Sequence, residues 1–132
     1  MTIIDGKALS EKILIEIEQE HSELEKKVGR KAGLAVIIVG ENSASQIYVR
    51  NKIKACERVG FYSETIRLDE NITEENLLSE IKKLNNNSNI DGILVQLPLP
   101  EHIDELNIVN AILAEKDVDG FHTTNIGKMM IG

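Results

Sequence analysis

Two side chains that could carry acid–base and stacking chemistry, Tyr48 and Lys52, lie one helical turn apart after an apolar run. That run, residues 34–39, is rich in β-branched residues and does not alternate, which is typical of a strand covered on both faces, and Gly40 ends it. The segment that follows has helical periodicity, with Lys52 at the border of its apolar stripe. Because helical side chains lean toward the N-terminus, a phenol and an amine are predicted to point together toward the carboxyl end of the strand.

Lys52 also has an ordinary explanation. Lysines often lie along the rim of an apolar helix face, with the aliphatic stem packed and the ammonium in water. Periodicity alone favours this explanation, because structural rims far outnumber catalytic lysines. A functional role for the amine therefore depends on what the rest of the chain brings to the same place.

A second apolar run, residues 92–97, contains one polar side chain, that of Gln96, and stops at Pro98 and Pro100. Its composition predicts a second fully buried strand. Proline cannot donate to a strand ladder and fixes an extended exit. A buried amide such as that of Gln96 needs hydrogen-bond partners, so we expect polar groups near the end of this strand.

Helix and strand signals alternate along the rest of the chain. Asp5 can cap a long scaffold helix whose apolar positions keep close to one face, and Thr73 can cap a later helix. Residues 61–68 nearly alternate between apolar and polar, which predicts a less buried strand at an edge of the sheet.

Two short polar segments are interpreted as a turn and a cap. Residues 29–33 carry Arg30 and Lys31 between two glycines, which indicates a helix stop with a solvated basic pair. Ser43 or Ser45 can accept a hydrogen bond from the first turn of the helix that carries Lys52.

Strands alternating with helices predict a three-layer α/β sandwich with a mainly parallel sheet and right-handed crossovers. If both apolar runs are central, the strand order is 2-1-3, and a ligand crevice opens at the carboxyl ends of strands one and three. Residues 40–45 and 96–100 lie at those ends, and Tyr48 and Lys52 lean toward the same crevice. This convergence favours a functional role for Lys52.

Length and composition bound the class of protein. The 132 residues, 42% of them hydrophobic and 28% charged, predict one globular domain. A net charge of -7 argues against a nucleic-acid partner. Cys56 is the single cysteine, which excludes a disulfide framework and a thiolate metal cluster and predicts a reduced thiol in the cytoplasm. No signal-peptide core follows Met1, and no apolar run approaches the roughly 20 residues that would span a membrane.

Three segments of the sequence resemble those of a known protein family. They are VGENSASQIYVRNK at 39–52, GILVQLPLP at 92–100 and KDVDGFH at 116–122. Together they resemble the bifunctional methylenetetrahydrofolate dehydrogenase/methenyltetrahydrofolate cyclohydrolase family, and the match runs in order from residues 5–7 to residues 125–128. The resemblance implies an N-terminal catalytic domain with the layout of the amino-acid dehydrogenase substrate domains.

The resemblance also implies an activity, NADP-dependent oxidation of 5,10-methylenetetrahydrofolate to the 5,10-methenyl form and hydrolysis of that form to 10-formyltetrahydrofolate. It places the protein in one-carbon metabolism, serving purine, methionine and histidine biosynthesis, as a cytoplasmic homodimer. The family's functional positions fall on these residues: the catalytic lysine on Lys52, its glutamine partner on Gln96, the stacking tyrosine on Tyr48, the pterin-binding carboxylate on Asp119, and pocket residues on Ser45, Leu97 and Pro98.

These residue types suit that chemistry. The methenyl substrate is a cation, which disfavours protonation of a neighbouring amine, so Lys52 would act as general base for water attack while Gln96 holds it in position. Asp119 offers a bidentate acceptor to the N–H edge of the pterin, and Tyr48 offers an aromatic face. Asp117 is expected to be structural.

Four further positions in or near the matching segments are given no catalytic role. His122 is expected to be partly buried and Lys54 to be solvated. Ser43 and Ala114 stand where the family usually has proline, which should change only the stiffness of their loops.

Family members continue with a Rossmann domain that binds NAD(P), and they close with a segment that packs on the first domain. The nine glycines of this chain never form G-x-G-x-x-G, so residues 1–132 are expected to hold the folate half of the cleft, with no cofactor-binding or metal residues of their own. Two other hypotheses remain open. One is a folate-binding or dimerising module without catalysis. The other is an unrelated α/β substrate domain like those of amino-acid and shikimate dehydrogenases. The KDVDGFH segment argues against this second hypothesis.

Overall fold

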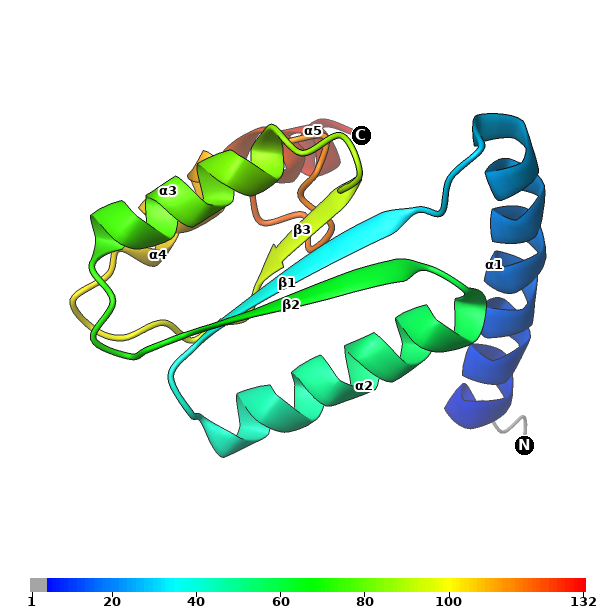
Figure 1. Cartoon of the computed structure of the whole chain (residues 1–132), viewed down its shortest axis with the longest axis horizontal. Coiled ribbons are helices and arrows are strands. Elements are labelled where there is room, and N and C mark those ends of the chain that lie inside the picture. The colour runs from blue at the N-terminus through cyan, green and yellow to red at the C-terminus, as the bar shows by residue number, and fades with distance from the viewer. Residues whose placement is uncertain (1–4) are drawn as a thin grey trace.

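Three parallel strands form a sheet in the order β2-β1-β3, as predicted. The computed structural model describes residues 5–132 (Figure 1). In it β1 spans Gly33–Val39, β2 spans Tyr62–Leu68 and β3 spans Gly92–Val95. β1 lies in the middle, where Ile37 pairs with Ile66 of β2 and Val95 of β3. β2 is an edge strand, as its alternating pattern indicated.

The prediction that both apolar strands are central is wrong for β3. β3 pairs with β1 alone, and it ends at Val95 rather than Leu97. All four of its residues are nevertheless buried, because a later segment covers its outer edge: the Ile93 N–H donates to the Lys116 carbonyl at 2.7 Å, and Ile93 forms an isolated bridge with Asp117. An apolar run indicates that both faces of a strand are buried, but not what lies beside the strand. A loop can cover the outer edge as well as a further strand can.

The sheet lies between two helical layers, which confirms the three-layer sandwich (Figure 1). α2 (Ser43–Val59) covers one face, and α3 (Glu74–Asn85) with α4 (Glu105–Ala111) covers the other. Because successive strand residues point to opposite faces, Val36 and Ile38 pack on α2, while Ile37 joins the larger cluster on the other side. The side chains of α3 and α4 that complete this larger cluster are Leu77, Ile81, Leu84 and Ile108.

The long first helix, α1 (Gly6–Val28), begins at Asp5 as predicted and ends at Gly29, whose φ of 82° suits glycine. It crosses the end of α2 instead of covering the sheet (Figure 1). Much of its apolar face is exposed, for example Leu9 at 53% and Leu24 at 50%. The scaffold helix is therefore attached at one side only in this chain.

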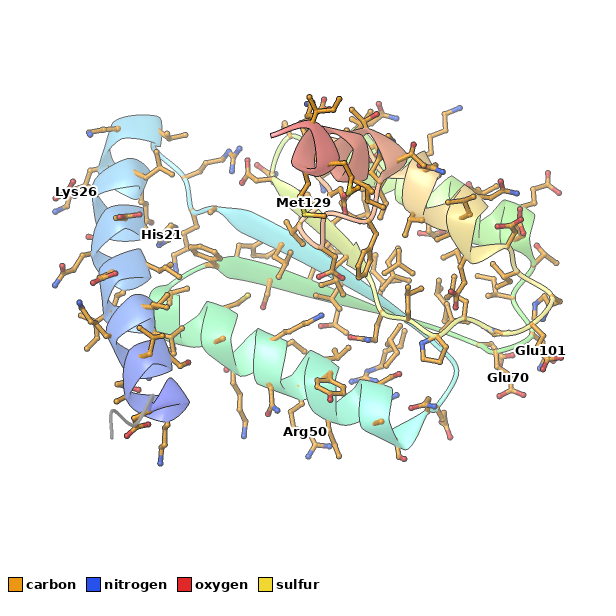
Figure 2. The ribbon with its side chains drawn as sticks, turned by 180° about the vertical axis from the view of Figure 1, so that it is seen from behind. His21, Lys26, Arg50, Glu70, Glu101 and Met129 are labelled. Atoms are coloured by element: carbon orange, nitrogen blue, oxygen red, sulfur yellow. The ribbon has the colours of Figure 1, made fainter. Side chains whose placement is uncertain are left out.

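Polar contacts make that attachment. His21 is the buried side chain of α1, on the side that faces the sheet (Figure 2). Its Nδ1 lies 3.1 Å from the Val59 carbonyl oxygen, and its Nε2 accepts the Ala32 N–H at 3.1 Å. Arg58 near the end of α2 adds a bidentate ion pair with Glu11. These contacts set the angle at which α1 leaves the domain.

Two local expectations are corrected. The cap of α2 is Asn42, whose side chain accepts the Ser45 N–H at 3.1 Å, and neither Ser43 nor Ser45 caps the helix. Asparagine caps helices as well as serine does, and the helix begins one residue after it. Arg30 is not simply solvated, because it makes a bidentate pair with Asp91 at 2.7 Å for each bond.

The Asp91 carboxylate joins the amino ends of β1 and β3. It also accepts the Gly33 N–H at 2.9 Å. The hydrogen bonds from the Arg30 guanidinium, aided by that N–H, lower the pKa of Asp91 to about 2 against the opposing effect of burial. The predicted cap at Thr73 is confirmed, because its side chain accepts the Asn76 N–H at 3.3 Å at the start of α3. No helix in the described part of the chain combines the length and apolarity that crossing a bilayer requires.

Candidate functional site

The structure brings Lys52 of α2 together with Gln96, the residue that follows β3. Lys52 Nζ lies 3.4 Å from Gln96 Oε1, a long hydrogen bond between residues 44 positions apart. Both side chains are half-buried. The other end of the Gln96 amide is also held, because its Nε2 donates to the Leu97 carbonyl at 2.8 Å. This bond turns the amide oxygen toward the amine.

α2 sets the position of the amine. Val49 is fully buried against Val36, Ile38 and Leu94, which fixes the rotation of the helix on the sheet. Lys52 then emerges at the rim on the side of Gln96. Arg50, about 160° away around the helix, points away from the sheet (Figure 2).

Ser45 and Tyr48 complete the flank of α2 on which Lys52 lies. Ser45 is buried, with 5% of its surface exposed. Tyr48 is 62% exposed, so its ring is available to a flat ligand. The predicted phenol and amine are thus presented by one helix.

The segment after β3 carries Gln96 and two predicted pocket residues, Leu97 and Pro98. Leu97 is half-buried against the larger core cluster, Pro98 is exposed, and the peptide bond between them is cis. The Leu99 N–H donates to Glu105 Oε1 at 2.9 Å, which ties the segment to α4. Sequence reasoning missed Glu105, because nothing local links an acidic residue in a helix to a turn six positions earlier.

Asp119 stands in a separate loop beside β3. Its side chain is exposed, and no direct contact joins it to Lys52 or Gln96 within the described chain. The loop begins at Asp117, which bridges to Ile93 of β3, the strand that Gln96 follows. Its neighbour Val118 lies against Gly92, the first residue of β3, so the structure does not bring Asp119 into contact with the Lys52–Gln96 pair.

Asp117 is the structural aspartate, as expected. It accepts hydrogen bonds from the backbone N–H groups of Gly120 at 3.1 Å and His122 at 2.9 Å, and from Asn125 Nδ2 at 2.9 Å. Burial alone would raise the pKa of Asp117, but these hydrogen bonds together lower it. His122 is half-buried and caps α5 (Thr123–Ile131) by accepting the Thr124 N–H at 3.1 Å.

Three further side chains complete the polar inventory. Lys54 is exposed, as predicted. Cys56 is a buried free thiol, and burial raises its pKa, so it is a poor nucleophile. Lys116 was missed: its Nζ donates to the carbonyls of Asn85 and Asn87, each at 2.9 Å. Among residues 5–132 there is no group of three or more metal-ligating His, Cys, Asp or Glu side chains.

Comparison with known proteins decides the family. The model of the tetrahydrofolate dehydrogenase/cyclohydrolase catalytic domain matches residues 4–119. The chain belongs to this family. Bifunctional protein FolD of Sulfurihydrogenibium sp. is 54% identical over 132 residues, which are 100% of this chain and 46% of that protein. FolD of Bacteroides thetaiotaomicron is 48% identical over 132 residues, 100% of this chain and 45% of that protein.

Solved structures of the family share the fold. The bifunctional FolD enzyme of Campylobacter jejuni superposes with a TM-score of 0.96 at 50% identity, covering 99% of this chain and 46% of that chain. FolD of Trypanosoma brucei, solved with NADP cofactor and inhibitor, has a TM-score of 0.94 at 40% identity, covering 98% of this chain and 44% of that chain. The chain thus spans less than half the length of these relatives. Family membership excludes the hypothesis of an unrelated substrate-binding domain.

Proposed function

We propose that the crevice between α2 and the carboxyl ends of β1 and β3 binds a reduced folate, and that this chain carries the catalytic half of a methylenetetrahydrofolate dehydrogenase/methenyltetrahydrofolate cyclohydrolase. The observation that carries the proposal is the contact between Lys52 and Gln96, 3.4 Å across two elements far apart in sequence. Periodicity leaves Lys52 as an ordinary rim lysine. The hydrogen bond from Gln96 Nε2 to the Leu97 carbonyl holds the Gln96 amide against the amine of Lys52. A solvated rim lysine would not need such a fixed polar partner.

Lys52 is the general base of the hydrolytic step in this proposal. Water attacks the methenyl carbon, its proton passes to the amine, and the adduct opens by cleavage of one carbon–nitrogen bond to leave the formyl group on N10. The cationic ring beside the amine favours the neutral, basic form. Gln96 accepts from the amine and so keeps its lone pair near the attacking water. The bond tightens when the substrate excludes solvent.

In this proposal the remaining residues of the site bind the folate. Tyr48 stacks on the pterin with its exposed ring, and Asp119 accepts hydrogen bonds from the N–H edge of the pterin with its free carboxylate. Leu97 and Pro98 form the apolar wall on the side of β3. Ser45 lies in the first turn of α2, on the same flank of the helix as Tyr48 and Lys52.

The dehydrogenase step needs NADP, which the T. brucei relative contains. No glycine-rich phosphate loop occurs among the nine glycines of this chain, so the residues present do not fit the cofactor and no hydride-transfer step is assigned to them. NADP would be bound mainly by the part of the relatives that this chain does not span. Residues 1–132 are then the folate domain.

The wider setting follows from the family and the composition. The family places the protein in tetrahydrofolate one-carbon metabolism. We extend the proposal to a cytoplasmic homodimer that supplies one-carbon units to purine, methionine and histidine biosynthesis. The single, reduced cysteine suits that compartment, and the net charge of -7 disfavours nucleic acid as a partner.

The test is the absorbance decay of 5,10-methenyltetrahydrofolate mixed with the purified chain. Decay faster than the spontaneous rate, saturating with substrate, supports catalysis by this chain. Saturable binding with only spontaneous decay supports the alternative, a folate-binding or dimerising module, for which the open, exposed Tyr48 side of the crevice is the favouring observation. Absence of binding refutes both.

A further inference from the structure

The loop that presents Asp119 is held from inside by Asp117. The Asp117 carboxylate gathers donors from three later positions, Gly120, His122 and Asn125. Between the carboxylate and these donors the chain folds back on itself, and Gly120 adopts a φ of 72°, which suits glycine. Asp119 lies within this closed turn, and its own carboxylate takes no part in the bonds that close it.

The base of the turn is anchored to the sheet and to α3. The Ile93 N–H of β3 donates to the Lys116 carbonyl at 2.7 Å. Lys116 Nζ donates to the carbonyls of Leu84 at 3.2 Å and Asn85 at 2.9 Å, at the end of α3. Cations at this end of a helix also interact favourably with its dipole. The residue before Asp117 is therefore fixed from two directions.

Asn125 closes the far side of the turn. Its Nδ2 donates both to Asp117 Oδ2 at 2.9 Å and to the Ala114 carbonyl at 2.8 Å. One amide thus joins the carboxylate to the segment that precedes the turn. Together these bonds hold Asp119 between two anchored ends, and a carboxylate fixed before the ligand arrives loses less conformational entropy on binding.

We propose that Asp117 is a positioning residue for folate binding, which acts through Asp119 by holding the turn of residues 117–125 in the conformation that meets the pterin edge. This inference rests on the proposed function, because it takes Asp119 as the pterin contact. It assigns to Asp117 a share of substrate affinity, although Asp117 touches no substrate. Charge-assisted bonds to backbone N–H groups are the strong members of the turn.

The experiment is a double-mutant cycle on tetrahydrofolate affinity, measured by calorimetric titration of the purified chain. Asp117→Asn keeps the size of the side chain but turns an amide donor toward donors of the loop. We expect it to weaken binding about tenfold, as loss of a charge-assisted hydrogen bond does. In the Asp119→Asn background the same change should weaken binding no further, because the carboxylate that Asp117 positions is already gone.

Asp69→Asn is the matched control. Asp69 also accepts bonds from a backbone N–H and a side-chain amide, those of Asn71 at 2.8 and 2.9 Å, but it follows β2, on the far side of β1 from the turn. It should lower the melting temperature and leave affinity unchanged. A second variant, Asn125→Leu, removes one donor without touching the carboxylates and should weaken binding about threefold in the wild-type background only.

The outcomes separate the two proposals. If Asp119→Asn weakens binding and Asp117→Asn does not, or if their effects simply add, Asp117 is not a positioning residue. If Asp119→Asn leaves affinity unchanged, the pterin contact of the proposed function fails, whatever Asp117 does. Equal losses in Asp69→Asn and Asp117→Asn would show that the effect is one of general stability, and would overturn the inference.

Discussion

Replacing Gln96 by leucine tests whether the Gln96 amide holds the Lys52 amine in its catalytic position. Leucine keeps nearly the same volume and removes two hydrogen bonds, the long one from Lys52 at 3.4 Å and the one to the Leu97 carbonyl at 2.8 Å. Each contributes about 0.5–1.5 kcal/mol net, the longer one toward the lower figure. The half-buried leucine side chain offsets part of the loss by its apolar surface. Gln96→Leu should therefore lower the free energy of unfolding by only about 1 kcal/mol.

The effect on turnover should be larger than the effect on stability. Without its acceptor the Lys52 amine samples several positions at the rim, and misplacement of a catalytic group by about 1 Å can cost about a hundredfold in rate. We expect kcat for methenyltetrahydrofolate hydrolysis to fall about 10- to 100-fold while KM changes little. Stopped-flow absorbance gives both constants, and thermal unfolding gives the stability.

Gln46→Leu is the matched control for this prediction. Gln46 also lies on α2, but its amide bonds to Arg67 on the β2 side of the helix. Its loss should leave kcat and KM near their wild-type values. A Gln96→Leu variant with raised KM and unchanged kcat would refute the reasoning, because the amide would then be a substrate contact and not a holder of the amine.

Three further predictions concern the frame of the site and its cofactor. Gly33→Ala would place a Cβ 1.9 Å from the Asn89 carbonyl oxygen, so β1 must shift and chemical denaturation should show a loss of about 3 kcal/mol or more. Because the folded pKa of Asp91 is depressed to about 2, its stabilisation should be present above pH 4 and be lost as the pH falls from about 4 to about 2. Since its side chain is 47% exposed, the loss should be no more than about 1 kcal/mol, and Asp91→Asn should remove this part of the pH dependence of unfolding. Calorimetry should show no saturable NADP binding to the chain at millimolar cofactor, and tight binding would contradict the assignment of the cofactor to the part of the relatives that this chain does not span.

Local patterns were sufficient for most of the frame. The β-branched run at 34–39, the near-alternation at 61–68 and the cap at Thr73 each predict an element to within a residue, because strand burial and helix capping are determined by neighbours in sequence. The outer edge of β3 could not be predicted in this way. Whether a buried strand has a strand or a loop beside it depends on the path of a segment more than 20 residues later.

Within the site, too, some contacts could be predicted from the sequence and others could not. Helical phase predicts that Lys52 leans toward the crevice, and topology predicts that the end of β3 forms its other side, so the meeting of Lys52 with Gln96 follows from the sequence. The contacts of Arg30 with Asp91, 61 residues apart, and of Lys116 with the end of α3 do not follow, because they depend on where loops of no fixed period come to lie.

The central claim is that Lys52 is a base and not a solvated rim charge, and one comparison tests it most directly. Cyclohydrolase turnover should be measured for Lys52→Met and Lys54→Met, two lysines on the same helix, of which the second is exposed. Methionine replaces the aliphatic stem in both, so thermal unfolding should change little. The account predicts a fall of about 10²–10⁴ in kcat for Lys52→Met and near-normal turnover for Lys54→Met. Near-normal turnover of Lys52→Met would contradict it.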